Sequence, residues 1–255
     1  MIETLAIVLA AIIAGAINSI AGGGTLISFP ALVWAGRAPI IANATNTVAL
    51  WPGSFAGMVG FRRELSTIRR WLLLLTIPSL AGGALGAWLL LRTPERTFER
   101  IVPLLIFIAT ILLAAQEFIS KRLGTVARAH ENPTPGWVVF VFVFQFAVAV
   151  YGGYFGAGMG ILMLAALGLI GLTDLHQMNG LKNLLAICIN GVAAIYFAIS
   201  GAVVWRDGII MAVGAIAGGY FGARMARRLG RKFVRVSVVV IGLVMTVAMF
   251  MRTWS

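Results

Sequence analysis

The sequence predicts an all-α integral membrane protein of two inverted repeats, each a glycine-broken hairpin followed by three transmembrane helices. Three observations carry this prediction. Of the 255 residues, 60% are hydrophobic and only 11% are charged, whereas a soluble domain averages about 25% charged residues. Glycine clusters interrupt two long apolar stretches. A set of matching residues also recurs at a constant offset of 136 positions.

The composition places most of the chain inside a lipid bilayer. The mean hydropathy is +0.98, and short charged connectors separate the apolar segments. A net charge of +12 would also suit nucleic acid. In a membrane protein, however, Lys and Arg collect in cytoplasmic loops, so we expect a bilayer and no nucleic-acid partner. The single cysteine, Cys188, excludes an internal disulfide and a cysteine metal cluster, and we expect neither a metal nor a cofactor.

Eight apolar segments follow one another along the chain, and two of them are too long for one helix. They are 4–36, 40–61, 71–91, 101–118, 137–171, 180–201, 208–226 and 234–251. About 20 apolar residues span a bilayer, whereas Thr4 to Gly36 is a run of 33 residues without a charged side chain. Gly22, Gly23 and Gly24 lie in the middle of this run, and the run from Gly156 to Gly160 interrupts the fifth segment.

These glycine breaks are the strongest functional signal in the chain. Irregular backbone at membrane depth persists only where protein buries it or where it lines a polar cavity. In transporters such breaks often lie at the substrate site, because the ends of the half-helices supply binding dipoles. We therefore expect two hairpins, each breaking inside the membrane.

The two halves of the chain match as repeats. Residues 1–118 are the first membrane repeat, 119–136 a cytoplasmic linker and 137–255 the second membrane repeat. With the offset of 136, Gly22 and Gly24 match Gly158 and Gly160, Asn43 matches Asn179, and Thr110 matches Thr246. The same offset holds through four segments, which argues against chance even in a glycine-rich chain.

The distribution of Lys and Arg decides between parallel and inverted repeats. If each broken stretch crossed the bilayer once, the repeats would be parallel and these residues would divide nine to ten, with Lys182 left out. If each is a hairpin that returns to its own side, the repeats are inverted. The connectors 62–70, 119–136 and 224–235 then share one side, with 13 Lys and Arg against six. The positive-inside rule favours this second topology, which places both termini outside the cytoplasm.

Polar side chains within the membrane concentrate in segment 40–61 and its repeat mate 180–201. At about 100° per residue along a helix, four polar residues of the first segment share one stripe. These residues are Asn43, Asn46, Thr47 and Ser54, and their equivalents are Asn179, Lys182, Asn183 and Asn190. Two related helices thus present matching polar stripes, each after a broken hairpin, and we expect the stripes to face one another.

Lys182 is the only Lys or Arg that this topology places within a membrane segment rather than in a connector. An ionisable group there is costly enough to be a functional hypothesis by default, and an anionic substrate would neutralise it. Asn and Thr side chains can donate to oxyanion oxygens, and N–H groups at broken helices add a positive dipole. The candidate substrate-binding residues are Lys182, Asn43, Asn46, Thr47, Asn179, Asn183, Gly22, Gly23, Gly24, Gly158 and Gly160.

Two other interpretations of these residues stay open. Lys182 lies near the start of its segment, where a lysine can snorkel to the cytoplasmic interface. The Asn and Thr stripe can hold helices together without any ligand.

Two runs of sequence resemble the TauE/SafE sulfite exporter family. The first extends from Asn18 to Leu32, reads Asn-Ser-Ile-Ala-Gly-Gly-Gly-Thr-Leu-Ile-Ser-Phe-Pro-Ala-Leu, and is followed by the cluster from Ala42 to Thr47. The second is the run from Gly156 to Gly160, followed by the cluster from Asn179 to Asn183. The resemblance covers nearly the whole chain. It implies a secondary transporter that moves small sulfur-containing anions, such as sulfite or organosulfonates, usually outward.

The second copy departs from the family pattern at two positions. Met159 replaces the middle glycine of the triplet, and Ala166 stands at the equivalent of Pro30. A less sharply broken second hairpin is therefore expected.

The leading functional hypothesis is an anion transporter of the cell inner membrane that works by alternating access between the two repeats. An enzyme is not expected, because the sequence contains no P-loop, no His/Glu metal spacing and no Ser-His-Asp set with plausible placement. The alternatives are an anion channel, a membrane scaffold subunit of a larger complex and, last, an intramembrane enzyme. Large apolar faces allow a homodimer without requiring one. Which sulfur anion is moved, and with which coupling ion, stays open.

Overall fold

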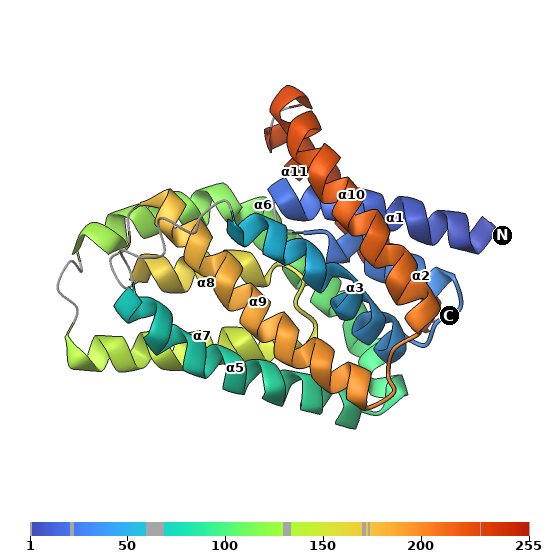
Figure 1. Ribbon diagram of the computed structural model, residues 1–255, viewed down its shortest axis with the longest axis horizontal. Helices are drawn as coiled ribbons and strands as arrows, with labels where there is room; N and C mark the ends of the chain where they lie inside the picture. The colour runs from blue at the N-terminus through green and yellow to red at the C-terminus, as the bar shows by residue number, and fades with distance from the viewer. Residues whose placement is uncertain are drawn as a thin grey trace.

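The computed structural model describes residues 2–20, 23–59, 69–129, 134–169, 172, 174–229 and 231–254, and this part of the chain is helical and free of strands (Figure 1). The helices are α1 (Ile2–Ile20), α2 (Thr25–Trp34), α3 (Pro39–Val59), α5 (Arg69–Arg92), α6 (Glu95–Ala129), α7 (Pro135–Tyr154), α8 (Met159–Leu169), α9 (Leu175–Ile199), α10 (Trp205–Leu229) and α11 (Arg231–Trp254). The predicted all-α class is confirmed, and each predicted apolar segment coincides with a helix or with a broken pair.

Several helices have the length and composition of membrane spans. Within the described residues, five meet this criterion, and they lie in α5, α6, α7, α9 and α11. Three shorter apolar helices, within α1, α2 and α8, belong to the two hairpins. The prediction of a multi-pass helical membrane protein is therefore confirmed.

Both glycine clusters interrupt a helix as predicted. In the first hairpin α1 ends at Ile20 and α2 begins at Thr25, and Gly22 lies outside the described residues. In the second hairpin residues 155–158 separate α7 from α8. Gly156 and Gly158 adopt positive φ angles of 77° and 73° there, a backbone region that glycine enters without steric cost.

The expectation of a less sharply broken second hairpin stays a prediction, because residues 21 and 22 of the first break lie outside the described residues. Met159 begins α8 rather than lying inside the break, so the glycine missing at that position is not needed. The two flanking glycines with positive φ suffice to end one helix and start the next.

The linker predicted at 119–136 is partly helical, because α6 continues to Ala129. The sequence from Ile119 to Ala129 contains no proline, so nothing in it stops the helix, and the next prolines are Pro133 and Pro135. The division into 1–118, 119–136 and 137–255 stays a prediction.

Helix contacts come in pairs that the 136-residue offset relates. α1 packs on α10 and the equivalent α7 packs on α5, while α3 packs on α10 and the equivalent α9 packs on α5. α2 contacts α11, as α8 contacts α6. Between α3 and α9 the indole N–H of Trp51 donates to the main-chain oxygen of Ile187 at 3.1 Å, and these two positions are 136 residues apart. The halves therefore correspond in packing, and their inversion across a bilayer stays a prediction.

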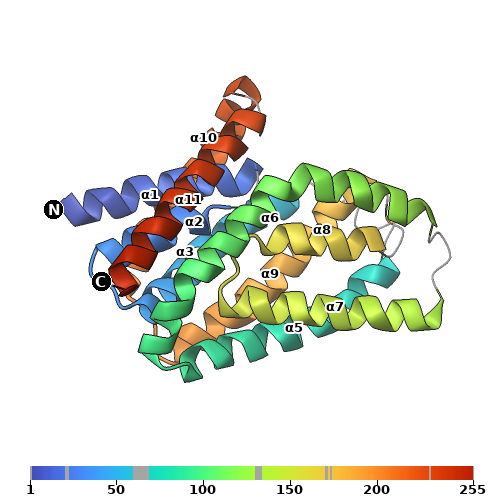
Figure 2. The ribbon, with the colours of Figure 1, turned by 180° about the vertical axis from the view of Figure 1, so that it is seen from behind.

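The ends of the chain lie together at one end of the molecule. In Figures 1 and 2 the N- and C-termini share an end with the turn between α5 and α6, and the end of α6 and the start of α7 lie at the opposite end. Both termini thus lie at the same end, as the predicted topology requires. Which end faces the cytoplasm stays a prediction.

Glycines set the closest helix pairs. A Cβ atom added at Gly218 of α10 would collide with the main-chain oxygen of Ile12 in α1, and one added at Gly86 of α5 would collide with that of Val150 in α7. These equivalent helix pairs therefore pack backbone against backbone, and small residues permit such close approach within membranes.

We expect Gly218→Ala and Gly86→Ala to destabilise the protein, because the new methyl group forces the paired backbones apart. Overpacking of this kind costs about 1–3 kcal/mol or more. Gly53→Ala in α3 is the matched control, since no atom lies within 4 Å of its added Cβ and Ala favours a helix over Gly. Thermal unfolding of the purified variants in detergent measures the effect, and equal midpoints for all three would contradict the packing described.

Candidate functional site

The start of α2 and the middle of α3 form a buried polar cluster, here called the first-repeat cluster, of Gly24, Thr25, Ser28 and Asn46. The Ser28 hydroxyl lies 2.6 Å from Asn46 Oδ1 and 3.1 Å from the Gly24 main-chain oxygen. Asn46 Nδ2 lies 3.4 Å from Thr25 Oγ1. Ser28 and Asn46 are almost fully buried. Asn46 therefore ties α3 to the first turn of a half-helix.

The first break has its own side-chain cap. The main-chain N–H of Gly24 donates to Asn18 Oδ1 at 2.9 Å. The first N–H groups of a helix lack partners within that helix, and an Asn oxygen is a usual acceptor for them. Asn18 thus satisfies one polar group that the glycine break exposes.

Asn43 reaches the other break. Its side-chain amide donates to the main-chain oxygen of Tyr154 at 2.9 Å, and Tyr154 is the last residue of α7. Asn43 is only 1% exposed, and Asn43 Oδ1 has no hydrogen-bond partner among the described residues. One acceptor at the end of a half-helix is therefore left unsatisfied.

Lys182 lies against the start of α8. Its ammonium group donates to Asn179 Oδ1 at 3.2 Å, and its aliphatic stem passes 3.4 Å from where a Cβ of Gly160 would stand. Gly160 is in the first turn of α8. Lys182 and Asn46 are equivalent positions, so each repeat sends one polar side chain from its long helix to the first turn of its own second half-helix.

The predicted site residues thus divide into groups. Lys182, Asn179 and Gly160 lie together at the start of α8, while Asn46 and Gly24 lie in the first-repeat cluster. Gly158 lies at the turn before α8 with its added Cβ at 3.4 Å from Ala109, and Gly23 is buried before α2.

Two predicted residues have less direct roles, and one is not described. Thr47 Oγ1 donates to the main-chain oxygen of Asn43 in its own helix at 2.9 Å. Asn183 is half-buried on α9, one residue beyond Lys182. Gly22 lies outside the described residues. Whether any of these residues binds a substrate stays a prediction.

Sequence reasoning missed four residues that satisfy the breaks. Asn18, Thr25 and Ser28 were within the run that carries the family resemblance, but only the glycines of that run were assigned a role. The fourth, Tyr151, donates its hydroxyl hydrogen to the main-chain oxygen of Ala157 at 2.6 Å across the second break. Polar side chains immediately flanking a glycine break are the signal that would have found them.

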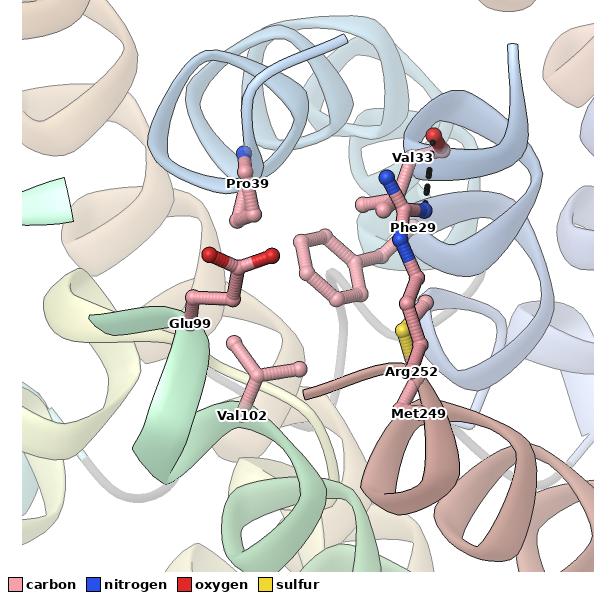
Figure 3. Close-up of a pocket in the computed structure, with 7 residues that line it drawn as sticks. All are labelled: Phe29, Val33, Pro39, Glu99, Val102, Met249 and Arg252. Carbon is pink, nitrogen blue, oxygen red and sulfur yellow. Dashed lines mark hydrogen bonds between the residues drawn. The ribbon is translucent and has the colours of Figure 1, made fainter. Parts of the chain in front are cut away.

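A separate small cavity lies at the end of the molecule that carries the termini. Its walls are Phe29, Val33, Pro39, Glu99, Val102, Met249 and Arg252 (Figure 3). The Arg252 guanidinium lies on the opposite wall from Glu99 and donates to the Val33 main-chain oxygen at 3.3 Å. None of the predicted substrate-binding residues lines this cavity, so it is distinct from the polar groups at the two breaks.

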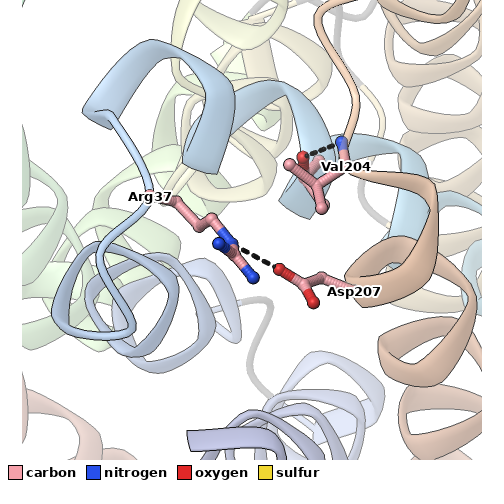
Figure 4. A network of polar contacts seen from close by, with 4 residues as sticks. Arg37, Val204 and Asp207 are labelled. Carbon is pink, nitrogen blue, oxygen red and sulfur yellow. Dashed lines mark hydrogen bonds and ion pairs between the residues drawn. The ribbon is translucent and has the colours of Figure 1, made fainter.

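An ion pair lies at the same end of the molecule. Arg37, after α2, lies 2.6 Å from the carboxylate of Asp207 in the first turn of α10 (Figure 4). This hydrogen bond raises the pKa of Arg37, so the guanidinium stays charged. Beside it the Val204 N–H donates to Thr45 Oγ1 at 3.0 Å. The two contacts fasten the connector after α2 and the middle of α3 to the start of α10.

This architecture defines a class: a multi-pass α-helical membrane protein with two glycine-broken hairpins and polar groups at both breaks. The chain belongs to the sulfite exporter TauE/SafE family, whose model matches residues 7–249. The family resemblance found in the sequence is therefore confirmed, and with it membership of a family of membrane transport proteins.

Several similar proteins are named as transporters. A "probable membrane transporter protein" of Haemophilus influenzae is 28% identical over 93% of this chain and 90% of its own length. One from Sinorhizobium is 31% identical over 93% and 88%, and one from Escherichia coli K12 is 29% identical over 92% and 85%. No solved structure matches the chain.

We expect the Arg37–Asp207 pair to contribute more to stability than an exposed pair. The Asp207 side chain is 7% exposed, whereas Glu117, which pairs with Arg235 at 2.8 Å, is 64% exposed. A double-mutant cycle with Arg37→Gln and Asp207→Asn should give a coupling free energy of about 1–3 kcal/mol. The cycle with Arg235→Gln and Glu117→Gln should give less than about 1 kcal/mol.

The measurement is thermal or denaturant unfolding of the purified variants in detergent. Equal coupling in the two cycles would show that the Arg37–Asp207 contact does not fasten this end of the molecule.

Proposed function

We propose that this protein is a secondary transporter that exports small sulfur-containing anions, such as sulfite or organosulfonates, by alternating access between its two repeats. The observation that carries the proposal is the position of Lys182, whose stem lies against Gly160 at the start of a half-helix. The family name, sulfite exporter, supports the choice of substrate class.

The first support for this proposal is the charge of Lys182. A lysine inside a membrane protein is costly unless another group compensates it. Asn179 accepts a hydrogen bond from the ammonium group but carries no charge. An anion bound here would supply the missing negative charge, and Asn179 would then hold the ammonium group in position.

The second step is the dipole of α8. The first N–H groups of a helix lack partners within it and carry a partial positive charge, which makes a helix start suited to oxyanions. Because Gly160 has no side chain, the Lys182 stem can lie along the first turn of α8. An oxyanion would meet the ammonium group and the positive end of the α8 dipole together.

The third step concerns movement. The helix contacts of the two halves correspond in pairs, so one half can move against the other while similar contacts reform. Gly156 and Gly158 give the second break its positive φ angles and supply hinge freedom. Alternating access at a site between broken helices is the general pattern of secondary transporters with repeats. We place the protein in the cell inner membrane with both termini outside the cytoplasm, since the positive-inside rule favours that orientation.

We expect Lys182→Ala to reduce anion flux about ten- to a hundredfold, because losing a charge-assisted hydrogen bond costs about 1.5–3 kcal/mol. Flux is measured in proteoliposomes with sulfite, thiosulfate, sulfate and a short organosulfonate. Lys182→Arg keeps the charge and should retain part of the flux. Arg206→Ala removes an exposed cation and should leave the flux unchanged.

Each outcome of this experiment decides between the alternatives. Normal flux in folded Lys182→Ala would contradict the site and favour a snorkelling lysine. Currents far above the turnover of a transporter would indicate an anion channel. Absence of flux with every anion, from protein shown to be folded, would favour a scaffold subunit that acts with a partner.

A further inference from the structure

We propose that the break between α7 and α8 also binds a monovalent cation, with Asn43 Oδ1 and the main-chain oxygen of Tyr154 among its ligands. The cation would bind at the end of α7, and the anion of the proposed function at the start of α8. The binding site itself stands on the geometry below, whereas its role in coupling rests on the proposed function.

The first observation is the unsatisfied oxygen of Asn43. Its amide nitrogen donates to the Tyr154 main-chain oxygen at 2.9 Å, which fixes the orientation of the amide, because the reverse orientation would set two oxygens against each other. Asn43 Oδ1 is therefore the free acceptor, and it is buried without a partner among the described residues. An unsatisfied buried acceptor is costly, so a ligand that binds it would remove that cost.

A second buried amide lacks this constraint. Gln145 Oε1 also has no partner, but its nitrogen lies 2.9 Å from the Ser79 hydroxyl. A hydroxyl can donate as well as accept, so reversing the Gln145 amide would give its oxygen a partner. Asn43 therefore needs a ligand to satisfy its oxygen, whereas Gln145 does not.

The second observation is the position of Asn43 at a helix end. The last carbonyl groups of α7 form the negative end of its dipole. The Tyr151 oxygen accepts from the Phe155 and Gly156 N–H groups, and the Tyr154 oxygen accepts from Asn43. In discontinuous membrane helices such ends and unwound carbonyl groups coordinate cations. Asn43 Oδ1 adds a neutral oxygen to the carbonyl oxygen of Tyr154.

Aromatic rings surround this end of α7. Phe155 packs edge-on against Phe29, with ring centroids 5.5 Å apart, and Phe98 packs against Tyr154 at 5.7 Å. The three phenylalanines are buried. The three rings offer no polar atom, so a ligand at this end of α7 would bind through Asn43 Oδ1 and main-chain oxygens.

The ligand chemistry favours a monovalent cation. Amide and carbonyl oxygens are hard, neutral ligands, whereas divalent cations usually need carboxylates as well. In the part of the chain that the structure describes, no three His, Cys, Asp or Glu side chains lie together as a metal site. A side-chain amide neither gains nor loses a proton near neutral pH, so Asn43 would bind an ion such as Na⁺ rather than carry a proton.

The location of the two charges explains how they could be coupled. α7 ends and α8 begins at the same four-residue turn, 155–158, so the negative end of one half-helix and the positive end of the other adjoin one break. A cation beside Asn43 and an anion beside Lys182 would each favour the other electrostatically. Binding of both would also leave the break with little net added charge.

The test is the Na⁺ dependence of thermal unfolding, measured on purified protein in detergent at constant ionic strength with Na⁺, K⁺ or choline. We expect Na⁺ to raise the Tm of the wild-type protein by about 2–4 °C in a saturable manner. Asn43→Leu should lose this rise. Gln145→Leu removes the other unsatisfied amide and should keep it.

Asn43→Asp provides a second variant in case Asn43→Leu does not fold. It keeps an oxygen in place but sets a carboxylate against the Tyr154 oxygen, so its Tm should rise more with Na⁺ than the wild-type Tm does. The cation site would be overturned if the wild-type protein and Asn43→Asp each had the same Tm in Na⁺, K⁺ and choline. An undiminished rise in Asn43→Leu would also overturn it.

Proteoliposome flux separates this inference from the proposed function. An imposed Na⁺ gradient should change anion flux several-fold in the wild-type protein and not in Asn43→Leu. A Na⁺-dependent Tm without any anion flux would overturn the proposed function and support the cation site. Anion flux that ignores the Na⁺ gradient would overturn the coupling.

Discussion

The structure depends on one constraint: wherever a helix breaks inside a membrane, its freed N–H and C=O groups need partners. No lipid can supply these partners, so the protein must. Asn18 accepts from the Gly24 N–H at the first break, while Tyr151 and Asn43 donate to the Ala157 and Tyr154 oxygens at the second. These polar residues therefore lie where the glycines interrupt the helices. Helix–helix contact alone would not require them to lie there.

The two repeats share an architecture but differ in chemistry. Asn46 and Lys182 are equivalent, and each reaches the first turn of the half-helix in its own repeat, yet one is neutral and the other is cationic. Asn46 forms a closed set with Ser28 and Thr25, which leaves it fully engaged. Lys182 has a neutral partner in Asn179 and no ion pair with another described residue. Under the proposed function, this difference favours the second break as the place where an anion would meet a positive charge.

Most of the fold could be predicted from the sequence, because hydropathy and the 136-residue offset depend only on the order of residues along the chain. The position of each break followed from its glycines, and at the second break Gly156 and Gly158 adopt positive φ angles, which glycine enters at no steric cost. Partners distant in the sequence could not be predicted. The contact between Asn43 and Tyr154 joins residues 111 positions apart, and no periodicity encodes which half-helix end a side chain reaches. The start of α8 at Met159 could not be predicted either, because the sequence places Met159 between two glycines.

At the end of the molecule that carries the termini, the contacts between the repeats are made by charged side chains and differ from those at the breaks. Arg37 pairs with Asp207, and Arg252 donates to the Val33 oxygen, so two cations fasten the end of α2 and the connector after it to α10 and α11. These contacts join the first hairpin to helices of the second repeat. Under the proposed alternating access, relative movement of the repeats would have to break them.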